Sequence, residues 1–65
     1  MPIIQVHLLE GRSLDEKRKL VANMTDAVVK SLGVKPDAVR IMLQDMARHN
    51  YAVAGELVQD KKDGP

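Results

Sequence analysis

Pro2 is the residue of this chain best suited to acid–base chemistry. Removal of Met1 would make it the amino terminus and expose a secondary amine held in a ring. Ordinary α-amino groups titrate at about 7.7 to 8.0, and burial or nearby cations lower that pKa toward neutrality. A base with such a pKa is suited to proton transfer. The alternative is structural, because proline lacks an amide donor and is tolerated at the first residue of a strand.

Two arginines, Arg12 and Arg40, lie close to the ends of predicted elements, where clefts can form. A planar guanidinium binds a carboxylate in bidentate fashion, so the two together would suit a small dicarboxylate or keto acid. Each could equally be a solvated surface residue or part of an ion pair between subunits. The spacing of the two arginines does not decide between these alternatives.

Tyr51 is the single aromatic residue of the chain. A ring beside an amine displaces water and lowers the pKa of the amine, which favours its neutral, basic form. The alternative is a packing residue whose hydroxyl reaches solvent.

His7 lies within a predicted strand, and we interpret it as a structural or interface histidine and not as a catalyst.

A strand and a helix would position the first of these residues. Residues 3–9 alternate in polarity, which predicts a strand with one clearly buried face. Ser13 and Glu16 match a capping box, with Ser13 as the N-cap. Apolar residues then recur at three- and four-residue steps, which predicts a helix over 14–32 that ends at Gly33.

Residues 39–46 predict a second strand, residues 50–56 a short hairpin, and residues 59–65 a frayed, charged tail. The predicted helix is long enough to run back along a strand of eight residues, so the two strands become parallel neighbours in a βαβ unit. We therefore expect an α+β fold with a single β-α-β unit and a short C-terminal hairpin, all in one domain over 1–65.

The chain has 65 residues, and at that length a single hydrophobic core seldom supplies enough stability alone. It has no cysteine for a disulfide or thiolate zinc site, and its two histidines are too far apart in sequence to form a metal cluster. Ile3 and Leu9 make the first strand apolar on both faces, so its second face is expected to pack against another subunit. We predict a homo-oligomer.

Several classes of partner are not expected. The net charge is +1 with acids and bases interspersed, which gives no electrostatic footprint for nucleic acid or an anionic membrane. No apolar run approaches the length of a membrane span, and the N-terminus lacks the features of a signal peptide. A cytoplasmic location is expected.

From Pro2 to about Leu57 the chain resembles the 4-oxalocrotonate tautomerase family. The resemblance rests on chain length and on four features: Pro2, the sequence LEGRS at residues 9–13, Arg40 within VRI at 39–41, and YAVAGE at 51–56. Tyr51 departs from the family archetype, which has phenylalanine there, and its hydroxyl needs a polar partner. Ala52 and Ala54 replace glycines of the archetype, which bears on the backbone of the hairpin.

The resemblance implies that Pro2 is a general base acting on a dienol such as 2-hydroxymuconate to give its conjugated 2-oxo isomer. It implies that Arg12 and Arg40 bind carboxylates, the second typically from a neighbouring subunit, and that Tyr51 is the active-site ring. It also implies a homohexamer built as a trimer of dimers, aromatic hydrocarbon catabolism as the setting, and no cofactor. An amide-linked Pro2 has no basic lone pair, so Met1 must be removed.

Two rival interpretations remain. A related proline-dependent dehalogenase would be expected to carry a water-activating carboxylate near Val53 and a further arginine near Leu9, and the chain has neither. Glu10 and Glu56 do not fit these roles by position. In a non-catalytic oligomeric subunit, Pro2 would be only the start of a strand.

Overall fold

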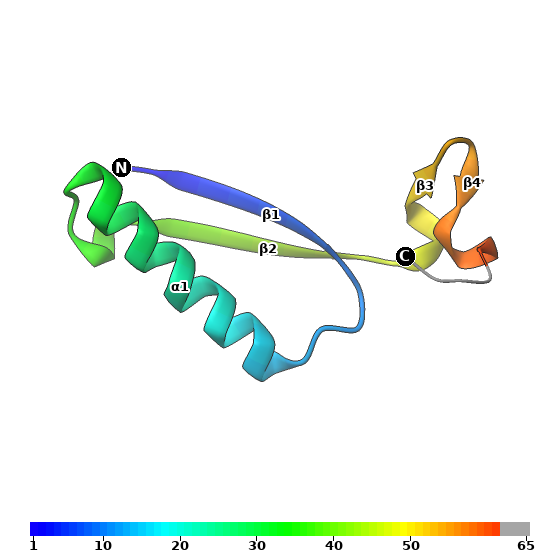
Figure 1. The fold of residues 1–65 in the computed structure, drawn as a ribbon, viewed down its shortest axis with the longest axis horizontal. Helices are drawn as coiled ribbons and strands as arrows, with labels where there is room; N and C mark the ends of the chain where they lie inside the picture. Colours follow the sequence, from blue (N-terminus) through cyan, green and yellow to red (C-terminus); the bar gives the residue numbers. More distant parts are fainter. Residues whose placement is uncertain (62–65) are drawn as a thin grey trace.

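The computed structural model describes residues 1–61 and contains two long strands, a long helix and a small hairpin (Figure 1). These elements are β1 (Ile3–Leu9), α1 (Leu14–Leu32), β2 (Arg40–Met46), β3 (Ala52–Val53) and β4 (Glu56–Leu57). Short 3-10 turns occupy Pro36–Ala38, Arg48–Asn50 and Val58–Asp60. The predicted α+β architecture, one β-α-β unit followed by a C-terminal hairpin, is confirmed.

β1 and β2 are parallel, with Ile3 opposite Arg40 and Leu9 opposite Met46. The one buried face predicted for residues 3–9 is formed by Ile4, Val6 and Leu8, which are half-buried, as are Ile41 and Leu43 of β2. α1 lies along one side of this strand pair (Figure 1). The opposite face is open to solvent, where Ile3 is 57% and Met42 is 48% exposed.

The helix begins and ends where its sequence signals place it. The backbone N–H of Glu16 donates to Ser13 Oγ at 3.1 Å, and the backbone N–H of Ser13 donates to Glu16 Oε1 at 2.9 Å. The predicted capping box is therefore confirmed, and it satisfies two backbone donors near the helix start. Gly33 has φ 70° and donates its N–H to the carbonyl of Val29, which ends the helix with a left-handed residue.

Some boundaries differ from the sequence predictions. β2 begins at Arg40 and not at residue 39, because the N–H of Val39 donates to the carbonyl of Pro36 and closes the preceding turn. The hairpin strands run from 52 to 57, because Asn50 belongs to a 3-10 turn and Leu57 pairs with Ala52. The predicted frayed tail 59–65 begins inside a 3-10 turn, Val58–Asp60, and its residues 62–65 lie outside the described residues.

A single chain buries very little of its apolar surface. Among residues 1–61, Val58 is the one buried hydrophobic residue, at 1% exposure. The radius of gyration is 14.9 Å, whereas a compact chain of this length would have roughly 11 Å. The accessible area of 5046 Å² also exceeds the roughly 4,100 Å² expected for a folded monomer of this mass. The fold therefore leaves apolar surface that contact with other chains would cover.

Candidate functional site

Pro2 and Arg40 lie side by side at the amino ends of β1 and β2. The backbone N–H of Arg40 donates to the carbonyl oxygen of Pro2 at 3.1 Å, so the parallel pairing continues up to Pro2. Arg40 Nε also donates to the thioether sulfur of Met1 at 3.1 Å. Pro2 is half-buried, whereas Met1 is 75% exposed. Removal of Met1 would free both the Pro2 nitrogen and the guanidinium of Arg40.

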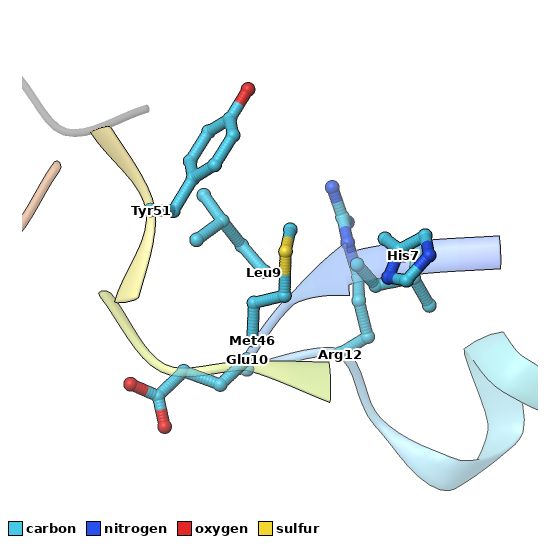
Figure 2. Close-up of a pocket in the computed structure, with 8 residues that line it drawn as sticks. His7, Leu9, Glu10, Arg12, Met46 and Tyr51 are labelled. Atoms are coloured by element: carbon cyan, nitrogen blue, oxygen red, sulfur yellow. The ribbon is translucent and has the colours of Figure 1, made fainter. Parts of the chain in front are cut away.

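An open pocket of about 510 Å³ lies at the other end of the strand pair (Figure 2). Tyr51 and Arg12 project to the same side of the chain, and the side chains of Leu9 and Met46 lie between them. The pocket thus combines a cation, an aromatic ring and an apolar floor. Its lining residues are His7, Leu8, Leu9, Glu10, Gly11, Arg12, Met46 and Tyr51.

The backbone conformation of Gly11 and an ion pair to Glu16 set the position of Arg12. Gly11 has φ 116°, a conformation that favours glycine, and it turns the chain from β1 toward the helix. Arg12 Nη1 then lies 3.4 Å from Glu16 Oε2 in an exposed ion pair. The backbone N–H of Ser13, and more weakly the charge of Arg12, hold the pKa of Glu16 below its usual value. Because surface ion pairs of this kind are weak, the Arg12 guanidinium stays available to another carboxylate.

Tyr51 is held by the segment that follows β2. Its carbonyl oxygen accepts the N–H of the buried Val58 at 2.8 Å, which closes the chain around the β3–β4 hairpin. The tip of that hairpin is formed by Ala54 and Gly55, with φ 56° and 81°. Positive φ at both residues is typical of a type I′ turn. The hairpin therefore forms although the first residue of the turn is Ala54 and not glycine.

Sequence reasoning gave no role to Glu10 and Arg48. Glu10 Oε2 accepts the backbone N–H of Arg48 at 3.0 Å, and Arg48 Nη2 donates to the carbonyl of Val58 at 3.2 Å. The sequence LEGRS at residues 9–13 indicated a role for Arg12. No local pattern links Glu10 to Arg48, which lies 38 positions later in the chain. Only the pairing of β1 with β2 brings the two segments together.

The four candidate residues form two groups that are far apart within one chain. Pro2 and Arg40 are at the amino ends of the parallel strands, and Arg12 and Tyr51 are beyond their carboxyl ends. The seven residues of β1 separate the two groups by about 23 Å, at 3.3 Å per residue. A substrate that contacts Pro2 and Arg12 together therefore needs residues from more than one chain.

Among residues 1–61, no group of three or more His, Cys, Asp or Glu side chains is arranged to hold a metal ion. No helix within the same residues has both the length and the apolar character needed to cross a membrane.

Comparison with known proteins gives consistent results. The family described as "Tautomerase enzyme" matches residues 2–61. A probable tautomerase of Halalkalibacterium halodurans is 39% identical over 61 residues, which cover 94% of this chain and 100% of that protein. A probable tautomerase of Staphylococcus haemolyticus is 44% identical over 55 residues, covering 85% and 89% of the two chains.

Solved structures share the fold. A 4-oxalocrotonate tautomerase isozyme from Methylibium petroleiphilum superimposes with a TM-score of 0.84 at 48% identity, covering 86% of this chain and 88% of that one. The 4-oxalocrotonate tautomerase homologue YwhB superimposes with a TM-score of 0.90 at 34% identity, covering 94% and 100%. Similarity in sequence and in structure thus extends over nearly the whole chain.

Proposed function

This chain belongs to the tautomerase family, and we propose that it is an isomerase that converts a dienol such as 2-hydroxymuconate into its conjugated 2-oxo isomer. Family membership supports tautomerase activity in general. The choice of Pro2 as the base rests on one observation: Pro2 is half-buried just before the start of β1, with Arg40 directly beside it. A cyclic amine next to a cation is suited to take a proton from an anionic substrate.

In the proposed reaction, the lone pair of the Pro2 nitrogen takes the hydroxyl proton of the dienol. Electron density shifts along the conjugated chain as the carbonyl forms, and the protonated amine then returns a proton to a distant carbon. One O–H bond breaks and one C–H bond forms, so no redox partner takes part. Arg12 and Arg40 bind the carboxylates and stabilise the charge that develops. Neither a cofactor nor a metal enters these steps.

We further propose that the working form is a homohexamer, arranged as a trimer of dimers. The open face of β1 and β2 and the low burial of the single chain support an assembly of several copies. The separation of Pro2 from Arg12 supports a site built between copies. The hairpin that follows Tyr51 is proposed to pair with a neighbouring chain. We place the enzyme in the cytoplasm, in aromatic hydrocarbon catabolism.

The test is the rate of ketonisation of 2-hydroxymuconate by the wild type and by Pro2→Ala. We expect Pro2→Ala to lose at least about a hundredfold in rate, because a positioned base contributes about 10² to 10⁴. Pro36→Ala is the matched control, since Pro36 opens a 3-10 turn and has no role in the site. Equal rates for Pro2→Ala and the wild type would rule out the proposed base.

A second measurement addresses the substrate class. Phenylenolpyruvate has one carboxylate, whereas 2-hydroxymuconate has two. If both Arg12 and Arg40 bind substrate, kcat/KM is expected to be higher for the dicarboxylate by roughly tenfold or more, since a charge-assisted hydrogen bond contributes about 1.5 to 3 kcal/mol. Equal values for the two substrates would contradict the use of two arginines.

A further inference from the structure

Glu10 lines the pocket but its carboxylate is directed away from the space between Tyr51 and Arg12 (Figure 2). One of its oxygens accepts the backbone N–H of Arg48 at 3.0 Å. Its own backbone N–H donates to the carbonyl of Met46 at 2.9 Å. Glu10 therefore joins the turn that carries Arg12 to the segment between β2 and the hairpin.

Arg48 continues this connection toward Tyr51. Its half-buried guanidinium donates through Nη2 to the carbonyl of Val58 at 3.2 Å. The N–H of the same Val58 donates to the carbonyl of Tyr51 at 2.8 Å. A continuous chain of hydrogen bonds thus runs from Glu10 through Arg48 and Val58 to Tyr51.

The hairpin needs such a connection because it has little support of its own. β3 and β4 have two residues each, and an isolated two-stranded hairpin is marginally stable in water. Figure 1 shows the hairpin beyond the end of β2, apart from the β1–β2 pair. Its orientation relative to Arg12 therefore depends on the bonds that link it to the β1–α1 turn.

We propose that Glu10 and Arg48 are positioning residues that hold the ring of Tyr51 in a fixed relation to Arg12. The consequence for catalysis rests on the proposed function, in which Arg12 binds a carboxylate and Tyr51 contacts the substrate. Glu10 acts as a hydrogen-bond acceptor and not through its charge, because its carboxylate is bonded to the backbone N–H of Arg48 and directed away from the space between Tyr51 and Arg12. Glutamine at position 10 keeps the acceptor and removes the charge, so it separates the two roles.

The single aromatic residue makes the test direct. With one tyrosine and no tryptophan or phenylalanine, the near-ultraviolet circular dichroism of the protein comes from Tyr51, and it reports how firmly the ring is held. We would compare the wild type with Glu10→Ala, Glu10→Gln and Arg48→Met, and measure KM and kcat for 2-hydroxymuconate in parallel. Glu56→Ala is the matched control, because Glu56 is a hairpin carboxylate whose one side-chain partner among residues 1–61 is Lys61, at 3.8 Å.

We expect Glu10→Ala and Arg48→Met to lose at least about half of the tyrosine signal. Their KM should rise roughly two- to tenfold with a smaller change in kcat, since each loses one hydrogen bond of this connection. Glu10→Gln and Glu56→Ala should keep the wild-type signal and KM. Rescue by glutamine is the outcome that a purely electrostatic role would not produce.

Two results would overturn the proposal: a wild-type tyrosine signal and KM in Glu10→Ala, or Glu10→Gln that behaves like Glu10→Ala. If far-ultraviolet spectra show that Glu10→Ala does not fold, Arg48→Met decides, because it keeps the backbone donor to Glu10 and removes only the bond to Val58. A wild type without tautomerase activity would refute the proposed function alone, since the tyrosine signal still tests the positioning of the ring.

Discussion

Mixing two impaired variants tests whether the site is shared between chains. Pro2 and Arg12 lie at opposite ends of β1, about 23 Å apart at 3.3 Å per residue. Neither side chain can bridge that separation, so the proposed site would take Pro2 from one chain and Arg12 from another. Pro2→Ala is expected to lose at least about a hundredfold in rate. Arg12→Ala is expected to lose roughly 10- to 150-fold in kcat/KM.

The activity recovered on mixing is set by the fraction of sites that contain both intact residues. When equal amounts of the two variants are unfolded together and refolded, each site has an even chance of an intact Pro2 and, independently, an even chance of an intact Arg12. About one quarter of the sites then contain both residues in a randomly mixed symmetric oligomer. The rate of 2-hydroxymuconate ketonisation should therefore return to about one quarter of the wild-type value.

The control replaces the Arg12→Ala chain with a Pro2→Ala, Arg12→Ala double variant. This mixture contains no intact Pro2, so it should remain inactive. Native mass spectrometry of both mixtures verifies that the chains have exchanged. Mixed oligomers of the two single variants that stay inactive would show that the site does not combine these residues from different chains, and the reasoning from strand length would be refuted.

Three further outcomes are expected. Because the pKa of Glu16 is lowered in the folded chain, its ionised form stabilises the helix start above its unfolded pKa, and this contribution is lost as the pH falls through the lowered folded pKa. Glu16→Gln should therefore show a smaller fall in Tm between neutral pH and about pH 3 than the wild type, and an equal fall would contradict this role. Ala54→Gly should raise Tm, since it relieves about 1 kcal/mol of strain from the left-handed backbone of Ala54. A lower Tm in this variant would show that the backbone of Ala54 is not strained. Protein that retains Met1, identified by intact mass, should not turn over substrate, because the Pro2 nitrogen is then an amide, and full activity in such protein would exclude Pro2 as the base.

The sequence alone determined the local elements and the fold class. The alternation in residues 3–9, the Ser13–Glu16 capping box and the stop at Gly33 depend on side chains within a few positions of one another. Local periodicity and capping act over one or two turns, so they can be recognised without a structure. The family resemblance was likewise carried by short stretches, and the comparisons confirm it. The roles of Pro2, Arg12, Arg40 and Tyr51 stay predictions.

Only the tertiary structure decided which of these residues lie together. Parallel pairing of β1 with β2 places Pro2 beside Arg40 and puts Arg12 with Tyr51 at the far end, a grouping that no local pattern contains. The bond from Glu10 to Arg48 joins residues 38 positions apart, and it exists because the two strands end side by side. Contacts of this kind depend on strand register and chain direction, which are properties of the whole fold and not of any short segment.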